Sequence, residues 1–256
     1  MTSAGPVAGG AEGLPDWARR PANLANALAG ELVQRIVRGD YPPGTAMPSE
    51  PALCESYSVS RTVVREAVKM LQEKGLVQVR RGSGTVVNPD ATWNMLDELV
   101  LTATVAEDNG LEVLDDLVVT RRILESDMAH VAARLAEAEV VAQLEELVDA
   151  MDTLVNDPTA YAVKDRAFHD TIMRASGNRI ARAVVRALES QVVNTARYVG
   201  EIRPDLCVAS NRGHRNVYLR IADHDPEGAA QAMFTHITEA WVVRRGGPGE
   251  PDRLQR

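Results

Sequence analysis

Residues 47–87 read MPSEPALCESYSVSRTVVREAVKMLQEKGLVQVRRGSGTVV, and this stretch decides the fold of the first part of the chain. Four apolar residues after Ser60 recur at helical spacing: Val64, Ala67, Val68 and Leu71. Arg61, Arg65 and Lys69 form a second stripe, at positions i, i+4 and i+8 of the same helix. The pattern therefore predicts a helix with one face that packs and one cationic face.

A second, shorter helix is predicted just upstream. Ser49 is a typical N-cap, and Pro51 would lie in the first turn, where the missing N–H costs nothing. Residues 57–59 form the short connection between the two helices. This order predicts a helix-turn-helix.

A basic hairpin is predicted after the cationic helix. Gly75 ends that helix, and residues 76–79 and 85–87 have the composition of strands. They flank Arg80-Arg81-Gly82-Ser83-Gly84, a basic turn that contains glycine. A hairpin of this kind beside a helix-turn-helix predicts a winged helix.

These residue types suit binding to double-stranded DNA. An arginine near the start of a recognition helix can give a bidentate pair to guanine in the major groove, and Arg61 has that position, with Arg65 one turn on. Gly82 would let the backbone approach the duplex, and Arg81 can enter a groove or contact phosphates. A basic helix alone is usually only a solvated face, but helix, turn, cationic helix and basic hairpin in this order favour DNA binding.

The stretch resembles the DNA-binding domain of the GntR family of bacterial transcription regulators over residues 24–88. The motifs that carry the resemblance are MPSE at 47–50, SVSRTVVREA at 58–67, GLV at 75–77 and the GSG of the wing at 82–84. The resemblance implies the following DNA contacts: Arg61, Thr62, Arg65, Arg81 and Gly82. We expect Lys69 to contact phosphate. The family commonly has an arginine directly after the PSE motif, whereas this chain has Pro51, so a contact from that position is not expected.

Length and charge indicate two domains. The 256 residues suffice for two ordinary cores, and the net charge of −8 divides into +2 for residues 24–88 and −10 for residues 89–256. A localised cationic footprint on an acidic body fits a DNA-binding domain joined to another domain. We expect a disordered tail at 1–20, a winged helix-turn-helix at 21–88, an all-helical effector-binding and dimerisation domain at 89–245, and a second disordered tail at 246–256.

The cysteine pattern and the absence of long apolar runs predict a cytoplasmic protein. Cys54 and Cys207 fall in different predicted domains and offer neither a disulfide framework nor a metal knuckle. No apolar run has the length of a membrane span, and no signal peptide is recognisable at the start.

The second domain is predicted to be helical throughout. Breaks with turn or capping chemistry separate seven helices, at about 91–107, 111–137, 139–156, 158–176, 178–201, 204–223 and 225–245. Short connections between so many helices indicate an antiparallel bundle. The fold class is therefore mainly α, with an N-terminal winged helix followed by an all-α bundle.

Four polar residues are predicted to point into this bundle. Asp165 and His169 lie at i and i+4 on a face shared with apolar residues, and His214 and His236 lie on apolar faces of two further helices. A lone inward histidine is usually a hydrogen-bonded core residue. One aspartate and three histidines together, however, supply the oxygen and nitrogen ligands of a divalent metal, with zinc favoured and nickel or manganese as alternatives.

The same region resembles the FCD effector-binding domain of the FadR subfamily over residues 92–245, through DRAFH at 165–169, ASGN at 175–178 and the two later histidines. In metal-containing members the ligands match Asp165, His169, His214 and His236. Arg121 fits the R..LE motif of the family and would anchor a ligand carboxylate; its plain interpretation is a salt bridge to Glu125. Asn178 is a second effector-binding candidate, although capping of the next helix explains it more simply.

The leading interpretation is a homodimeric transcription regulator, a repressor by analogy with the family, that binds a short palindromic operator. A small organic acid would control it, because four protein ligands leave two positions of an octahedral metal for a bidentate acid. Two alternatives remain. One is a metal-dependent hydrolase built on the Asp/His cluster; no inward Glu, Ser or Cys is placed as a base or nucleophile. The other is a metal-free regulator that senses acyl-CoA.

Overall fold

The computed structural model describes residues 20–107, 110–193, 195, 198 and 203–245. The chain forms two compact units that meet in sequence between Ala103 and Thr104. The predicted tail at 246–256 and all but the last residue of the tail at 1–20 lie outside the described residues.

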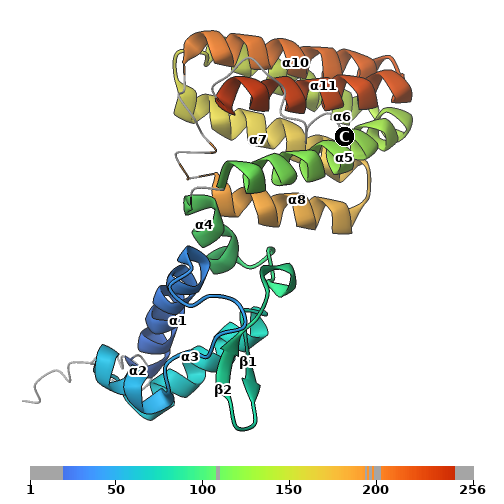
Figure 1. Cartoon of the computed structure of the whole chain (residues 1–256). Coiled ribbons are helices and arrows are strands. Elements are labelled where there is room, and N and C mark those ends of the chain that lie inside the picture. Colours follow the sequence, from blue (N-terminus) through green and yellow to red (C-terminus); the bar gives the residue numbers. More distant parts are fainter. Residues whose placement is uncertain (1–19, 108–109, 194, 196–197, 199–202, 246–256) are drawn as a thin grey trace, which may run out of the picture. The chain divides into compact units, whose positions relative to one another are not determined.

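The first unit is the predicted winged helix (Figure 1). Its helices are α1 (Arg20–Arg38), α2 (Glu50–Tyr57) and α3 (Arg61–Glu73), followed by the strands β1 (Val77–Arg80) and β2 (Gly84–Val87). The strands pair antiparallel, with Val77 opposite Val87 and Arg80 opposite Gly84. The turn between them requires left-handed backbone, which Gly82 supplies with φ of 82°.

Side-chain caps fix where the two helices of the helix-turn-helix begin. The hydroxyl of Ser49 accepts a hydrogen bond from the amide of Ala52, and the hydroxyl of Ser60 accepts one from the amide of Val63. Ser58 closes α2 in the left-handed region, with φ of 52°. The caps confirm the predicted helix starts and place Arg61 as the first residue of α3.

The core of the first unit is built from the apolar faces of α1 and α3. Leu28, Leu32 and Ile36 of α1 are buried as predicted. Leu24, which was expected to share their face, is instead 49% exposed, because α1 turns Ala25 and Ala29 toward the core. Helices α1 and α3 contact each other in this core.

The segment after the hairpin packs back on the first unit. Trp93 and Met95 lie against its core, and the Lys74 ammonium at the end of α3 pairs with Asp97 at 2.5 Å. A Cβ atom on Gly75 would lie 2.2 Å from the carbonyl oxygen of Thr92, so the close approach requires glycine there. The compact unit therefore extends past the linker that we expected near residues 88–91.

The helix expected from residue 91 begins later than predicted. A single 3-10 turn, η2 (Asp90–Thr92), precedes an irregular stretch, and α4 (Glu98–Ala106) follows. Contacts to the end of α3 hold this stretch out of helix, since the amide of Asn94 donates to the carbonyl of Lys74. The apolar periodicity alone gave no sign of these contacts.

The second unit is helical throughout its described residues (Figure 1). Its helices are α5 (Gly110–Leu135), α6 (Ala138–Thr153), α7 (Pro158–Ala175), α8 (Arg179–Val192), α10 (Pro204–Ala222) and α11 (Pro226–Arg245), while α4 belongs to the first unit up to Ala103. The helix expected over 178–201 ends at Val192, and most of the residues beyond it lie outside the described part. Among the described residues, no helix combines the length and apolar character needed to span a bilayer.

The long helix α5 lies at the centre of this bundle and contacts α7, α8, α10 and α11. A buried carboxylate ties it to α11: Asp115 accepts hydrogen bonds from the Trp241 indole at 2.8 Å and from Arg245 at 2.9 and 3.0 Å. Together α5, α7, α10 and α11 enclose the predicted polar cluster.

Candidate DNA-binding surface and metal centre

The exposed face of α3 carries the residues predicted to contact DNA. Arg61, Thr62, Arg65 and Lys69 are all exposed, while Val64 on the opposite face is buried. Among the described residues, Arg61 has no ion pair, so its guanidinium projects from the first turn of α3 without a competing carboxylate. This is the position from which a recognition helix reaches base edges.

Two of the cations have partners within the first unit. Nε of Arg65 lies 3.0 Å from Glu50, which belongs to the PSE motif, and Lys69 lies 4.0 Å from Glu73. Both pairs are solvent-exposed, and such pairs contribute about 0–1 kcal/mol. Breaking either ion pair therefore costs little free energy, so Arg65 and Lys69 remain available to contact phosphates.

The wing presents a second basic element. Arg80 and Arg81 are exposed at the tip of the hairpin, beside Gly82. Pro51 is also exposed, in the first turn of α2, and brings neither a donor nor a charge to this surface. An arginine, which the GntR family commonly has at that position, is replaced here by a residue that offers no charge to DNA.

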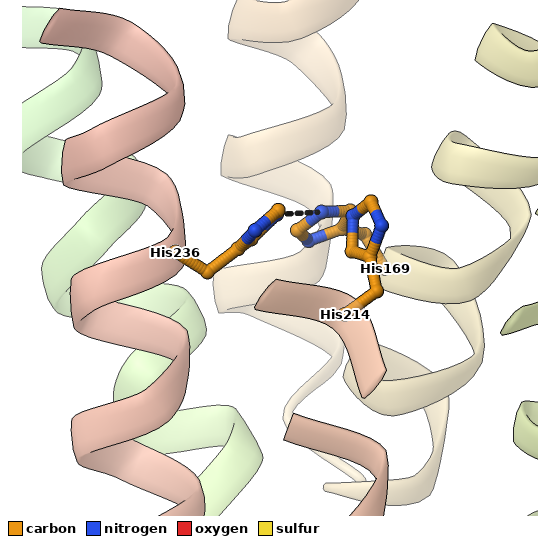
Figure 2. Close-up of side chains that lie close together, drawn as sticks. All are labelled: His169, His214 and His236. Carbon is orange, nitrogen blue, oxygen red and sulfur yellow. Dashed lines mark hydrogen bonds between the residues drawn. The ribbon is translucent and has the colours of Figure 1, made fainter. Parts of the chain in front are cut away.

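Three histidines meet in the second unit. His169 on α7, His214 on α10 and His236 on α11 point toward one another (Figure 2), and each is buried. One candidate donor atom from each lies within 4.8 Å of the other two. Nε2 of His169 and Nε2 of His236 are 3.3 Å apart.

This geometry fits a shared metal ion. With metal–nitrogen bonds of about 2.0–2.1 Å, two imidazoles on one ion bring their nitrogens to about 3.0–3.4 Å. The two Nε2 atoms already stand at that separation, and Nε2 of His214 is buried without a hydrogen-bond partner. The His169–His236 contact is a hydrogen bond in the absence of an ion (Figure 2), and a divalent cation bound by all three imidazoles would replace it and satisfy the orphaned nitrogen of His214.

Asp165 adjoins the cluster from one turn earlier on α7. Its Oδ1 lies 3.2 Å from Nε2 of His214, without the alignment of a hydrogen bond. Burial acts to raise the pKa of Asp165, but the neighbouring His214, His169 and Arg244 lower it overall. The carboxylate is therefore ionised, as a metal ligand must be.

A buried carboxylate orients His169. Nδ1 of His169 lies 2.6 Å from Oε2 of Glu125, which leaves Nε2 to face His236. Burial acts to raise the pKa of Glu125, but Arg121 and His169 bring it down to about 2. Carboxylate–histidine pairs of this kind fix the tautomer and orientation of metal-binding imidazoles.

The other two histidines are uncharged at neutral pH. Burial lowers the pKa of His214, and burial together with the neighbouring imidazoles lowers the pKa of His236 well below its usual value. The hydroxyl of Tyr161 lies 3.5 Å from Nδ1 of His214, which again leaves Nε2 toward the cluster. Neutral imidazoles are the form that binds metal.

Arg121 is buried and satisfied by protein groups. Its Nε donates to Glu125 at 2.7 Å, a terminal nitrogen bonds the hydroxyl of Tyr198, and the same nitrogen lies 3.6 Å from Glu189. The plain interpretation as a salt bridge is thus confirmed. Arg121 also lines a small pocket with Asp165 and two of the histidines: His169 and His236.

Asn178 lies away from this site. It is exposed, and its side-chain oxygen accepts from the amide of Ala181, which makes it the N-cap of α8. It lines neither the small pocket nor the larger cavity beside it. The structure thus favours the capping role, and the effector-binding role for Asn178 has no support.

Sequence reasoning did not assign three residues that shape the cluster. Glu125 was identified only as a partner of Arg121, although i, i+4 spacing placed it on the same inward face. Tyr161 precedes Asp165 by one helical turn, a spacing that could have found it. Gly213 gave no signal, because its role depends on α11.

Replacing Gly213 with alanine is expected to weaken metal binding about tenfold or more. The added Cβ would lie 2.5 Å from Nδ1 and 3.1 Å from Cγ of His236, so the ring must move out of the cluster. Helix propensity alone favours alanine by about 1 kcal/mol, so loss of helix is not the cause. Competition with a fluorescent zinc chelator measures the change.

Gly30→Ala is the matched control for that variant, since an added methyl there meets nothing within 4 Å. It should leave zinc affinity unchanged. Equal zinc affinity in Gly213→Ala and the parent protein would contradict the position of His236 in the cluster.

Both domains of the chain match models of known protein families. Residues 24–87 match the bacterial regulatory proteins of the gntR family, and residues 116–239 match the FCD domain. The HTH-type transcriptional regulator YieP of Escherichia coli, itself described as uncharacterized, is 41% identical over 158 residues, covering 61% of this chain and 69% of its own. The chain belongs to the GntR family. It is a DNA-binding transcription regulator with a C-terminal FCD effector domain.

Two further likenesses span most of the chain. The galactonate operon transcriptional repressor of Escherichia coli is 26% identical, covering 85% of this chain and 95% of the repressor. The solved structure of Lar, described as controlling the agr system of Listeria monocytogenes, is 17% identical over 87% of this chain and 95% of its own, with a TM-score of 0.55. The latter likeness shows the fold alone.

Proposed function

We propose that this GntR regulator is a homodimeric repressor whose operator affinity is set by an organic acid bound at a divalent metal in the FCD domain. The observation that carries the proposal is the buried cluster of His169, His214 and His236, with Asp165 beside it. These residues would hold the ion, which would supply positive charge and open positions to a carboxylate.

Zinc is the metal that this donor set favours, with nickel or manganese as alternatives. Three imidazoles and one carboxylate are borderline ligands that zinc and nickel both accept. The carboxylate of Glu125 and the hydroxyl of Tyr161 hold two of the imidazoles with Nε2 toward the cluster. The name of the galactonate operon repressor supports both repression and control by an organic acid.

A homodimer follows from the way winged helices read palindromes. One recognition helix fills one half-site, so a two-fold symmetric operator requires two copies of α3. Arg61, Thr62 and Arg65 would contact bases, while Lys69 and the wing residues Arg81 and Gly82 would contact the backbone. We place the protein in the cytoplasm, where the DNA is.

The test measures operator affinity with and without bound zinc and in the presence of a panel of acids. Duplexes selected in vitro from a randomised pool provide the operator, and fluorescence anisotropy measures its Kd for zinc-loaded and chelator-treated protein. The panel contains sugar acids, dicarboxylates and 2-hydroxy acids. At least one acid should raise the Kd of the zinc-loaded protein about fivefold or more, as expected for typical coupling between two sites.

Matched controls separate the parts of the proposal. Galactitol replaces galactonate, so that a CH₂OH group stands in place of the carboxylate while the open chain and its hydroxyl groups are kept, and chelator-treated protein should not respond to any acid. An acid effect that persists without metal would contradict the metal site as sensor. Light scattering that reports a monomer both with and without operator would contradict the homodimer.

A further inference from the structure

A cavity of about 820 Å³ adjoins the histidine cluster. Residues of α7, α10 and α11 form most of its walls, and Asp165 and His236 belong to the lining. The cluster is therefore part of the cavity wall. Sites for drug-sized ligands measure about 300–1,000 Å³, so the space is much larger than two positions on a metal ion require.

Most of the lining is apolar. Ala162 and Val163 of α7, Leu206 of α10, and Ala240 and Val243 of α11 contribute to it. Val163 and Val243 are about half exposed, at 54% and 49%, so this apolar surface contacts solvent. A ligand with an apolar body would remove that surface from water, whereas a polyhydroxylated acid would not benefit from it.

The charges on the wall indicate where a carboxylate would lie. Arg121 is already balanced by Glu125 and Glu189. Arg244 of α11 lines both the cavity and the small pocket beside the cluster, and its guanidinium lies 6.0 Å from the ring centroid of Tyr198. Within the described part of the chain, no carboxylate forms an ion pair with Arg244.

The other charged groups of the lining are less suited than Arg244 to bind a ligand carboxylate. Three carboxylates face the cavity: Asp165, Glu189 and Glu239. Asp165 contacts His214, Glu189 pairs with Arg121, and Glu239 is exposed to solvent. Arg166 also lines the cavity but is exposed, whereas Arg244 is partly buried. A partly buried guanidinium that forms no ion pair with a carboxylate of the described residues, beside the histidine cluster, suits a ligand carboxylate.

We propose that the effector is an organic acid with an apolar body of several carbons, whose carboxylate lies between the histidine cluster and Arg244 and whose body fills the cavity along α7 and α10. This inference rests on the proposed function, which it narrows from organic acids in general to one chemical class. Arg244, and not Arg121, is then the cation that binds the carboxylate of the acid.

The test uses the zinc-loaded full chain and straight-chain 2-hydroxy acids, from 2-hydroxybutanoate to 2-hydroxyoctanoate, in calorimetric titrations. Affinity should rise about fourfold for each methylene that becomes buried, the factor for transfer of one CH₂ from water. Malate serves as a short, doubly charged comparison and should bind more weakly than 2-hydroxyoctanoate.

Substitutions at two positions locate the acid. Arg244→Met keeps length and apolar character but removes the charge, and it should weaken binding of every acid about tenfold, while Arg244→Lys should weaken it less. Ala162→Leu should narrow the cavity, which weakens binding of 2-hydroxyoctanoate but not of 2-hydroxybutanoate. Arg212→Met, at an exposed arginine of α10 that does not line the cavity, is the matched control.

The outcomes distinguish this inference from the proposed function. Zinc-loaded protein that binds short acids as tightly as long ones, or equally in Arg244→Met, overturns the inference and leaves the proposed function standing. Zinc-loaded protein that binds none of these acids overturns the inference, and it overturns the proposed function as well if it also binds no sugar acid or dicarboxylate of the larger panel. Zinc content and circular dichroism of each variant, expected to match the parent protein, show that a lost affinity does not come from a lost fold.

Discussion

Replacing Arg61 with alanine is expected to lower operator affinity about 30-fold or more, because a bidentate base contact is worth about 1–3 kcal/mol and a homodimer loses it in both half-sites. The fold should be unchanged, since Arg61 is exposed and the cap of α3 comes from Ser60. Fluorescence anisotropy with the selected operator, at one fixed salt concentration, measures the effect.

The matched control is Arg212→Ala, which removes the same charge from an exposed position in the second unit. It should leave operator affinity unchanged. Arg65→Ala should likewise lower affinity for the specific operator, whereas Lys69→Ala should weaken binding to all sequences alike and flatten the salt dependence. Wild-type operator affinity in a well-folded Arg61→Ala protein would show that α3 is not the recognition helix.

Much of the winged helix could be predicted because its signals are local. Ser49 and Ser60 each cap a helix through an amide three residues on, and such caps depend only on neighbouring sequence. The hairpin follows from a glycine turn between two short strands. These features do not depend on distant parts of the chain, so one sequence sufficed.

The structure departs from the prediction where contacts with residues distant in sequence determine burial or local conformation. Leu24 continued the apolar spacing of α1, but whether it is buried depends on what packs there. Residues 93–97 were expected in a helix, yet contacts to Lys74 and Gly75 at the end of α3 hold them in irregular structure. Helical periodicity does not report contacts of that kind.

In the second unit, too, features set within one helix could be predicted, whereas contacts between helices could not. Inward positions for His169, His214 and His236 could be read from the apolar faces of their helices, and the structure brings all three together. The spacing on one helix could not show that Glu125 of α5 reaches His169 of α7, or that Gly213 makes room for His236. Nor could it show the cavity, whose walls come from several helices.

Replacing His214 with alanine is expected to remove most of the bound metal and the stability that the metal provides. His214 is fully buried beside His169 and His236, and alanine would remove one of the three imidazole ligands. A ligand present at 100 times its Kd stabilises a fold by about 2.7 kcal/mol, which for a chain of this size corresponds to roughly 5–10 °C in melting temperature.

The measurement compares melting temperatures with added zinc and with chelator. Zinc should raise the melting temperature of the parent protein by that amount and leave His214→Ala almost unchanged, and elemental analysis should show the same loss. His130→Ala is the matched control, because His130 lies outside the cluster. Basal operator affinity should largely survive in both variants, since the residues expected to contact DNA lie in the other unit.

Comparing each variant with itself, with and without zinc, separates loss of metal from loss of packing. Removing a buried imidazole also leaves a cavity, which lowers the melting temperature whether or not metal is present. Only the difference between the zinc and chelator measurements reports the ion. An equal zinc-dependent rise in the parent protein and in His214→Ala would place the metal elsewhere, and no rise in the parent, with no metal found by elemental analysis, would rule out the metal site and the sensing that depends on it.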